Sequence, residues 1–92
     1  MKEIVGEVEL NDTQKIVITV EKYYETFRVH FRLHYLPDPY KYDKWKASGN
    51  GFFIDTDKWE NFKNLVIKTE EILMNIKEKD RLSRLEQLDM FT

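Results

Sequence analysis

The chain has no cysteine and few of the residue types that usually perform catalysis, with two histidines and two serines among 92 residues. The lack of cysteine excludes disulfides, thiolate zinc sites and cysteine nucleophiles. The histidines, His30 and His34, and the serines, Ser48 and Ser83, leave little material for a hydrolytic triad. We therefore expect a protein that is not an enzyme and that uses no metal or cofactor.

Long hydrophobic runs are also missing. Unbroken aliphatic runs reach three residues, as in Leu65-Val66-Ile67, whereas a membrane-spanning helix needs about 20. No basic start followed by an apolar stretch and a small-residue cleavage site is present, so we expect a cytoplasmic protein without membrane contacts. The 92 residues have room for one domain, and a chain this short gains from dimerisation or a dense core.

Neither sign of charge is in large excess over the whole chain, because the net charge is only −2. The charge is unevenly distributed along the chain, however: residues 1–14 carry −3, residues 15–50 carry +3 and residues 51–92 carry −2. A local patch, rather than the total charge, determines a binding footprint. The basic middle third is therefore the candidate region for binding a polyanion.

Three segments predict β-strands. In residues 2–10, Ile4, Val8 and Leu10 share one parity and the glutamates share the other. Residues 15–24 are rich in β-branched and aromatic side chains, which is typical of a strand. The third strand, residues 26–36, alternates most strictly, so that one face is apolar and the other is cationic. Its apolar parity is Phe27, Val29, Phe31, Leu33 and Tyr35, and its cationic parity is Arg28, His30, Arg32 and His34.

A hairpin that turns at Tyr24-Glu25 brings the two central strands into a consistent register. The predicted pairs are Ile18 with Phe31, Val20 with Val29, Glu21 with Arg28, and Thr19 with His30. Because the parities agree, we expect the cationic parity to lie on a single open face of the sheet.

The rest of the chain predicts one more strand and a helix. Pro37-Asp38-Pro39 ends the third strand, residues 40–51 form a long loop or ragged strand, and residues 52–54 form a last short strand. From Trp59 to Ile76, apolar residues recur at three- and four-residue steps, which indicates an amphipathic helix. Residues 77–92 are either a frayed helical extension or a flexible tail. The fold class is therefore α+β: a four-stranded antiparallel sheet followed by one long C-terminal helix.

The basic strand and the following loop combine cations with aromatic rings. Such a mixture suits single-stranded nucleic acid, because cations track the phosphates and aromatic planes stack on unpaired bases. The candidate residues are Tyr23, Arg28, His30, Arg32, Tyr40, Lys41, Tyr42, Lys44, Trp45 and Lys46. The alternative is an ordinary solvated sheet face beside a loop that anchors itself with aromatics. His30 and His34 share a parity, and we expect contacts with bases or solvent there rather than a metal site.

The segment Gln87-Leu88-Asp89-Met90-Phe91 follows a charged spacer. It resembles the pentapeptide by which bacterial replication and repair proteins dock on the sliding clamp. Gln87, Leu88, Met90 and Phe91 are the candidate contacts. The alternative is a helical tail whose apolar residues pack on the core. On this interpretation, residues 1–79 form a single-stranded nucleic-acid-binding domain and residues 80–92 a charged extension.

Two blocks of sequence resemble the single-stranded DNA-binding domain of the transcriptional coactivator family called positive cofactor four. The first runs from Ile18-Thr19-Val20 through Val29-His30-Phe31-Arg32 to His34-Tyr35-Leu36, and the second from Gly51-Phe52-Phe53-Ile54 to Trp59. The resemblance covers roughly residues 3–76. It implies a homodimer whose paired curved sheets hold single strands and whose helices contribute to the dimer core. It also implies base stacking by Tyr23 and Tyr35, and it matches Arg32 to a family arginine.

The chain departs from that family at several basic positions. Family lysines around the hairpin turn are replaced by Tyr24 and Thr26, while Lys41, Lys44 and Lys46 supply charge elsewhere. A serine- and lysine-rich regulatory arm is absent, which favours a bacterial or phage protein. The leading interpretation is a sequence-independent single-stranded DNA-binding homodimer in replication, recombination or transcription. The alternatives are a regulator that binds RNA or melted promoter DNA, and a protein-interaction adaptor.

Overall fold

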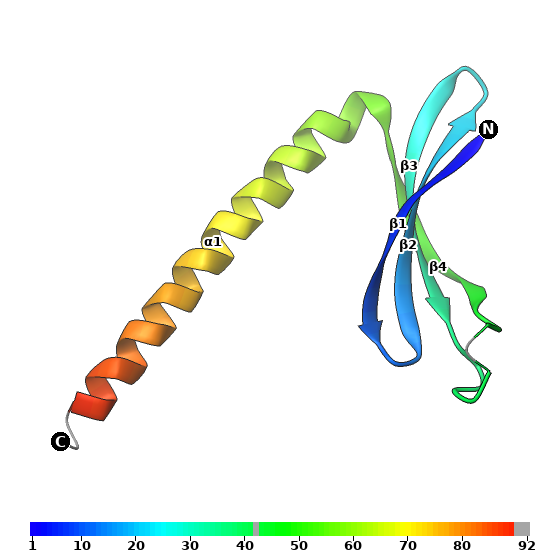
Figure 1. The fold of residues 1–92 in the computed structure, drawn as a ribbon. Helices are drawn as coiled ribbons and strands as arrows, with labels where there is room; N and C mark the ends of the chain where they lie inside the picture. The colour runs from blue at the N-terminus through cyan, green and yellow to red at the C-terminus, as the bar shows by residue number, and fades with distance from the viewer. Residues whose placement is uncertain (42, 90–92) are drawn as a thin grey trace. The chain divides into compact units, whose positions relative to one another are not determined.

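The computed structural model describes residues 1–41 and 43–89, with side chains as far as Gln87. Four antiparallel strands lie side by side in the order β1-β2-β3-β4 and are followed by one helix, as the sequence predicts (Figure 1). The elements are β1 (Lys2–Asn11), β2 (Gln14–Tyr23), β3 (Thr26–Tyr35), β4 (Lys46–Asp55) and α1 (Thr56–Asp89). Residues Met1–Trp59 form one compact unit, the sheet unit, and the residues from Glu60 onward belong to a second.

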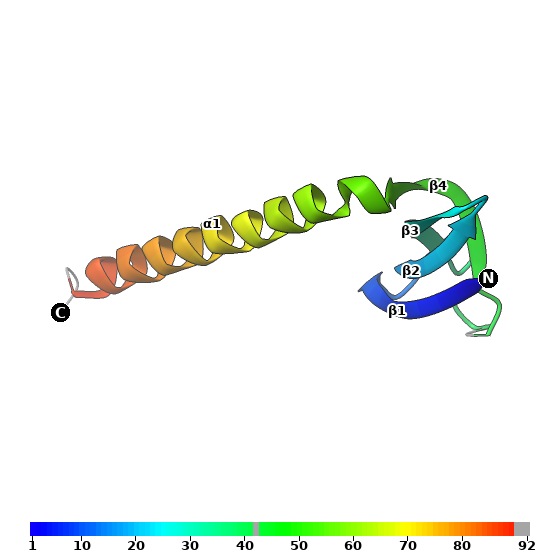
Figure 2. The ribbon, with the colours of Figure 1, turned by 90° about the horizontal axis from the view of Figure 1, so that it is seen from above.

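The β2–β3 hairpin has the register that the sequence predicts. Ile18 lies opposite Phe31, and Thr19 lies opposite His30. The hairpin turns at Tyr24, whose φ of 57° lies in the left-handed region, an uncommon conformation for a residue other than glycine. The strands twist as antiparallel strands do, and the twist is plain when the sheet is seen from above (Figure 2).

The first strand contains a bulge that the sequence pattern did not reveal. The register shifts between Ile4 and Gly6, so that Ile4 lies opposite Thr19 whereas Val8 lies opposite Ile16. An extra residue in one strand makes the side chains before it point to the opposite face of the sheet. Ile4 and Val8 therefore face opposite sides of the sheet, and the prediction that they share a face was wrong.

The last strand is longer than predicted. β4 begins at Lys46 rather than at residue 52, so the residues expected in a loop or ragged strand supply its first half. A register shift opposite Arg32–His34 accommodates the Ser48–Asn50 segment. Gly51 lies opposite Arg32, and a Cβ there would stand 2.5 Å from the Phe31 carbonyl oxygen. Only glycine permits this close approach of β4 to β3.

The helix α1 begins at Thr56 and continues without interruption to Asp89, so residues 80–89 are helical. Its surface carries ion pairs one turn apart, such as Lys63 with Glu60 and Arg81 with Glu78. Met90 and Phe91 of the clamp-like segment lie outside the described residues, as does Tyr42. Within residues 1–41 and 43–89, no helix combines the length and the apolar character that a bilayer crossing requires.

The sheet unit buries little. Leu36 is 4% exposed, and Thr19, a polar residue, is 5% exposed. Large apolar side chains on both faces stay partly open, for example Ile4 on one and Phe52 on the other. Both faces of the sheet unit therefore carry partly exposed apolar side chains.

Candidate nucleic-acid interface

The register of the ladder sorts the side chains of the sheet into two faces. We call one the basic face: it carries Lys15, Thr19, Glu21 and Tyr23 of β2, Arg28, His30, Arg32 and His34 of β3, and Phe53 and Asp55 of β4. The other, the apolar face, carries Ile16, Ile18 and Val20, then Val29, Phe31 and Leu33, and finally Phe52 and Ile54. Phe31 and Phe52 stack on the apolar face with ring centroids 4.8 Å apart.

Arg28 is clamped at the hairpin end of the basic face. Its guanidinium lies 3.7 Å from the centre of the Tyr23 ring and 4.0 Å from that of Phe53. Its Nε donates a hydrogen bond of 2.8 Å to Oδ1 of Asp55. The charge of Arg28 is therefore already paired, and the residue acts first as a positioning residue that holds Tyr23 against the sheet.

Tyr24 is a second aromatic residue at this end, and the sequence predicted no binding role for it. Its ring packs edge-on against Tyr23, with centroids 4.6 Å apart, and it is 82% exposed. Together with Thr26 and Arg28, the two tyrosines border a hollow at the hairpin end. In the sequence, the two adjacent tyrosines at a turn were the feature that could have indicated this role. A turn position alone does not show which ring packs on the sheet and which is exposed to solvent.

The middle of the basic face is a shallow hollow between β1 and β3. Glu21 organises it, because its Oε2 accepts a 2.9 Å hydrogen bond from Thr19 and lies 3.4 Å from Nδ1 of His30. Arg32 donates to the backbone carbonyl of Ser48 at 3.0 Å and remains exposed. Ile4, turned inward by the bulge, adds an apolar patch to the same hollow. Arg32 is thus placed to meet an anion from solvent.

The far end of the basic face is built around Lys15 and Trp45. The Lys15 ammonium lies 4.4 Å from the centre of the Trp45 ring and 2.9 Å from Oε2 of Glu7. Burial is the main cause that lowers the pKa of the neighbouring His34, and the charges of Lys15 and Arg32 lower it further. The neutral form of His34 is therefore favoured near pH 6.5, its ordinary pKa.

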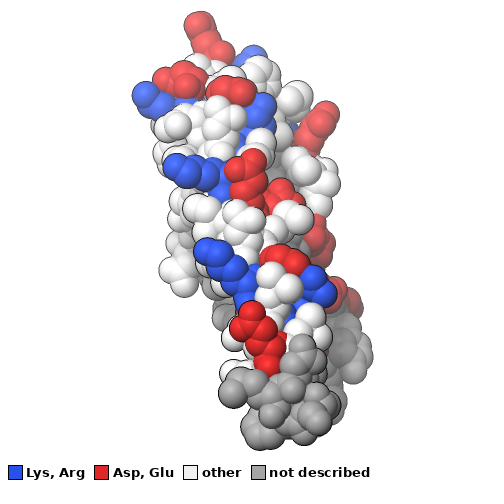
Figure 3. Space-filling model, turned by 90° about the vertical axis from the view of Figure 1, so that its left-hand side faces the viewer, with Lys and Arg blue, Asp and Glu red and all other residues white. Residues whose placement is uncertain are grey.

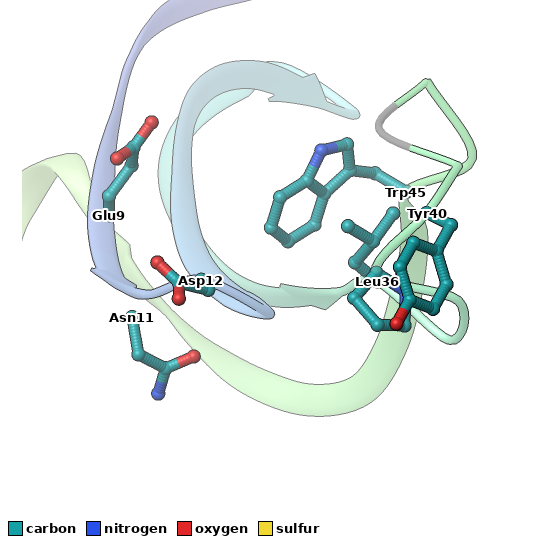
Figure 4. A pocket seen from close by; sticks show the side chains of 7 residues that line it. Glu9, Asn11, Asp12, Leu36, Tyr40 and Trp45 are labelled. Atoms are coloured by element: carbon teal, nitrogen blue, oxygen red, sulfur yellow. The ribbon is translucent and has the colours of Figure 1, made fainter.

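Beyond Trp45 lies a pocket that joins the β1–β2 turn to the loop before β4 (Figure 4). Its floor includes the buried Leu36 and its rim includes Tyr40, which is 88% exposed. In Figure 4, Glu9 and Asp12 stand on the side opposite Trp45 and Tyr40. This pocket therefore combines aromatic surfaces with carboxylates.

The structure brings together some predicted site residues and separates others. Tyr23, Arg28, His30 and Arg32 share the basic face, and Trp45 stands at its far end. Tyr35 does not join them, because it follows the apolar parity of β3 and pairs with Gln14 and Lys46. Lys46 is exposed at the start of β4 and lies opposite Tyr35, on the same side of the sheet as that residue. The remaining described candidates are the loop residues Tyr40, Lys41 and Lys44, all of them exposed.

Charges on the basic face are largely balanced within the sheet. Arg28 pairs with Asp55, Lys15 with Glu7, and His30 lies beside Glu21. Figure 3 shows another face of the molecule, where lysine and arginine side chains also lie beside aspartate and glutamate. Attraction of phosphates would therefore come mainly from Arg32 and the loop lysines. Among the residues that the structure describes, no three potential metal ligands cluster.

Comparison with known proteins identifies the architecture. No protein-family model and no curated protein sequence matches the chain. Among solved structures, it resembles a PC4 homologue from Burkholderia pseudomallei K96243, where PC4 is positive cofactor four. The orthorhombic form gives a TM-score of 0.58 at 20% identity, over 75% of this chain and 90% of that one. The tetragonal form gives 0.57 at 17% identity, over 75% and 98%. The chain has the PC4-like fold. The predicted resemblance is therefore confirmed at the level of the fold.

Proposed function

We propose that the chain is a non-enzymatic protein that binds single-stranded DNA and works as a homodimer in the cytoplasm of a bacterial or phage-infected cell. The observation that carries this proposal is the basic face, which has aromatic rings at both ends and Arg32 exposed between them. The PC4-like fold supports it, since the similar structure is a PC4 homologue. Replication, recombination and transcription are the processes in which such a protein would act.

The layout of the basic face favours an unpaired strand over a duplex. Tyr23 and Lys15, the residue under Trp45, stand eight positions apart on β2, which is about 27 Å at 3.4 Å per residue. A strand that crosses the face could stack bases at both ends, and each stack contributes on the order of 1–3 kcal/mol. A duplex hides its base planes and loses these contributions, because stacking needs unpaired bases.

A second copy of the chain is the proposed cover for the apolar surfaces. Phe52 of the apolar face is 55% exposed, and Leu65 and Leu73 of α1 are each about half exposed. A 92-residue chain that leaves such side chains open lacks the core that stability requires. Sedimentation should therefore show a dimer at micromolar concentration, whereas a clean monomer would contradict this part of the proposal.

Fluorescence anisotropy with labelled single-stranded DNA, duplex DNA and RNA of equal length tests the function. We expect single-stranded DNA to bind most tightly, with log K falling by about 0.7 per unit of log salt for each phosphate neutralised. Arg32→Gln should reduce this slope, whereas Lys63→Gln, which removes a helix charge already paired with Glu60, should not. Stronger binding to duplex, or binding indifferent to salt, would overturn the proposal. Tighter binding to RNA would favour the regulator alternative.

An adaptor that docks on a protein is the second candidate, because the internal ion pairs leave the basic face nearly balanced. Such an adaptor would bind none of the three nucleic acids above background. The same experiment therefore distinguishes the two candidates.

A further inference from the structure

We propose that the pocket beyond Trp45 binds one nucleobase that carries an exocyclic amino group, with guanine as its preferred occupant. This inference rests on the proposed function and specifies it, because it assigns a base preference to a protein otherwise expected to tolerate any sequence. Three features of the pocket lead to it: its aromatic side, its carboxylate side and its place at the end of the basic face.

The aromatic side offers planes on which a base can stack. Trp45 and Tyr40 stand on this side, together with the buried Leu36 (Figure 4). Trp45 is held by its contact with Lys15, so little conformational freedom is lost when a base packs against it. Tyr40 is anchored through its backbone, whose N–H donates to Oδ1 of Asp38 at 3.0 Å. Stacking of this kind tolerates every base and supplies affinity rather than selectivity.

The opposite side supplies hydrogen-bond acceptors. Glu9 and Asp12 stand across the pocket from Trp45 (Figure 4). A carboxylate only accepts hydrogen bonds, and it pairs with an amino group such as that of cytosine. Guanine presents an N–H beside an amino group, which matches the two oxygens of one carboxylate. Thymine has no amino group, and its single ring N–H is flanked by two carbonyl oxygens that the carboxylates repel, so the pocket discriminates against it.

The surroundings favour a base over a cationic side chain. A lysine or arginine from a protein would seek the same carboxylates and the same ring, but the Lys15 ammonium already occupies a position over Trp45. A second cation would have to displace this ammonium, which its ion pair with Glu7 holds in place. His34 and Arg32 lie on the same face as Lys15, on the way to Tyr23. A strand held along that face would deliver a base into the pocket at its end.

The test compares twelve-nucleotide oligonucleotides of thymidine with versions in which one internal position is guanine, cytosine or adenine. We expect the guanine version to bind about fivefold or more tightly than the all-thymidine strand, the lower end of the range for a bidentate contact to a base. Glu9→Gln and Asp12→Asn should lower this guanine-to-thymidine ratio, because an amide replaces one of the two acceptor oxygens of the carboxylate with an NH2 donor. Glu3→Gln is the matched control: it removes the same charge from β1, but Glu3 lies opposite Val20 of the apolar face.

The ratio separates base recognition from general electrostatics, because removal of a negative charge raises the affinity for every oligonucleotide alike. Equal binding of all four strands, with strong binding overall, would overturn this inference and leave the proposed function standing. Absence of binding to every strand would overturn the proposed function itself. Competition by a lysine-rich peptide, together with a guanine-to-thymidine ratio of one, would identify a cation site instead and also refute the inference.

Discussion

The close approach of β4 to β3 at Gly51 leads to a sharp prediction about stability. In Gly51→Ala, the new Cβ would stand 2.5 Å from the Phe31 carbonyl oxygen and 3.1 Å from Cα of Arg32. Both atoms belong to the backbone of β3, so no side chain can rotate away and the two strands must separate. Overpacking of this kind costs about 1–3 kcal/mol. In a domain of this size, each kcal/mol lowers the melting temperature by roughly 4–8 °C.

Gly49→Ala is the matched control, because a Cβ there meets nothing within 4 Å and Gly49 has no positive φ. By restricting the unfolded chain, this change should stabilise by about 0.4–1 kcal/mol. Gly51→Ala has the same effect on the unfolded state, so the difference between the variants isolates the clash in the fold. Urea unfolding at one fixed protein concentration measures it, since assembly would make stability depend on concentration. Equal midpoints for the two variants would refute the geometry of the β3–β4 ladder.

Three further predictions concern function and pH. In fluorescence anisotropy, Tyr23→Ala should weaken single-strand binding by about 1–3 kcal/mol. Tyr35→Ala should weaken binding less, because Tyr35 faces away from Arg28. Equal losses of affinity in the two variants would mean that the strand also follows the apolar side. The pKa of His34 is lowered from 6.5, so the unfolded chain binds more protons than the folded chain just below that pH. The free energy of unfolding should therefore fall as the pH drops below about 6.5, and this fall should be shallower in His34→Gln. Identical pH profiles of the melting temperature in the two proteins would exclude the effect. Deletion of residues 87–92 should abolish any binding to a sliding clamp while leaving single-strand affinity intact, and a lowered melting temperature would show instead that the tail packs on the fold.

The strict alternation of β3 made much of the fold predictable. Arg28, His30, Arg32 and His34 could occupy one face only if the strand was regular, and the register with β2 followed from matching parities. The three- and four-residue steps of apolar residues from Trp59 to Ile76 likewise predicted the helix α1, which begins three residues earlier, at Thr56. These features are local, and they agree with the tertiary structure that they form.

Features that depend on close approach between strands could not be predicted in the same way. The bulge at Val5 has no signature in the sequence of β1, since Ile4 and Val8 share a parity and only the pairing with β2 separates them. β4 contains two glycines, which are depleted in strands, and Gly51 is there because β3 leaves no room for a side chain. Contacts over long sequence distances decide both cases.

The residues of the candidate site could largely be predicted from the sequence, but the contacts between them could not. The sequence alone identified Arg28 as a cation and Tyr23 as a stacking ring. It did not show that Arg28 packs on the Tyr23 ring or that Asp55 pairs with the charge of Arg28. The carboxylates of the pocket come from Glu9 and Asp12, which belong to the acidic residues 1–14, where the sequence predicted no binding residue. Folding brings this acidic strand end beside the aromatic loop, and only the fold shows that the two form one pocket.

The pairing of charges on the basic face changes the expected balance of forces in binding. If Arg28 and Lys15 keep their carboxylate partners when a strand binds, they release no counterions, and the salt dependence reflects Arg32 and the loop lysines alone. Stacking must then carry a larger share of the affinity, because it is insensitive to salt. A face of this kind would hold an unpaired strand at salt concentrations that release such a strand from a purely cationic surface. It would also attract duplex DNA less than a purely cationic surface does, since Glu21 and Asp55 offset positive charge beside the path of the phosphates while no exposed base offers compensation.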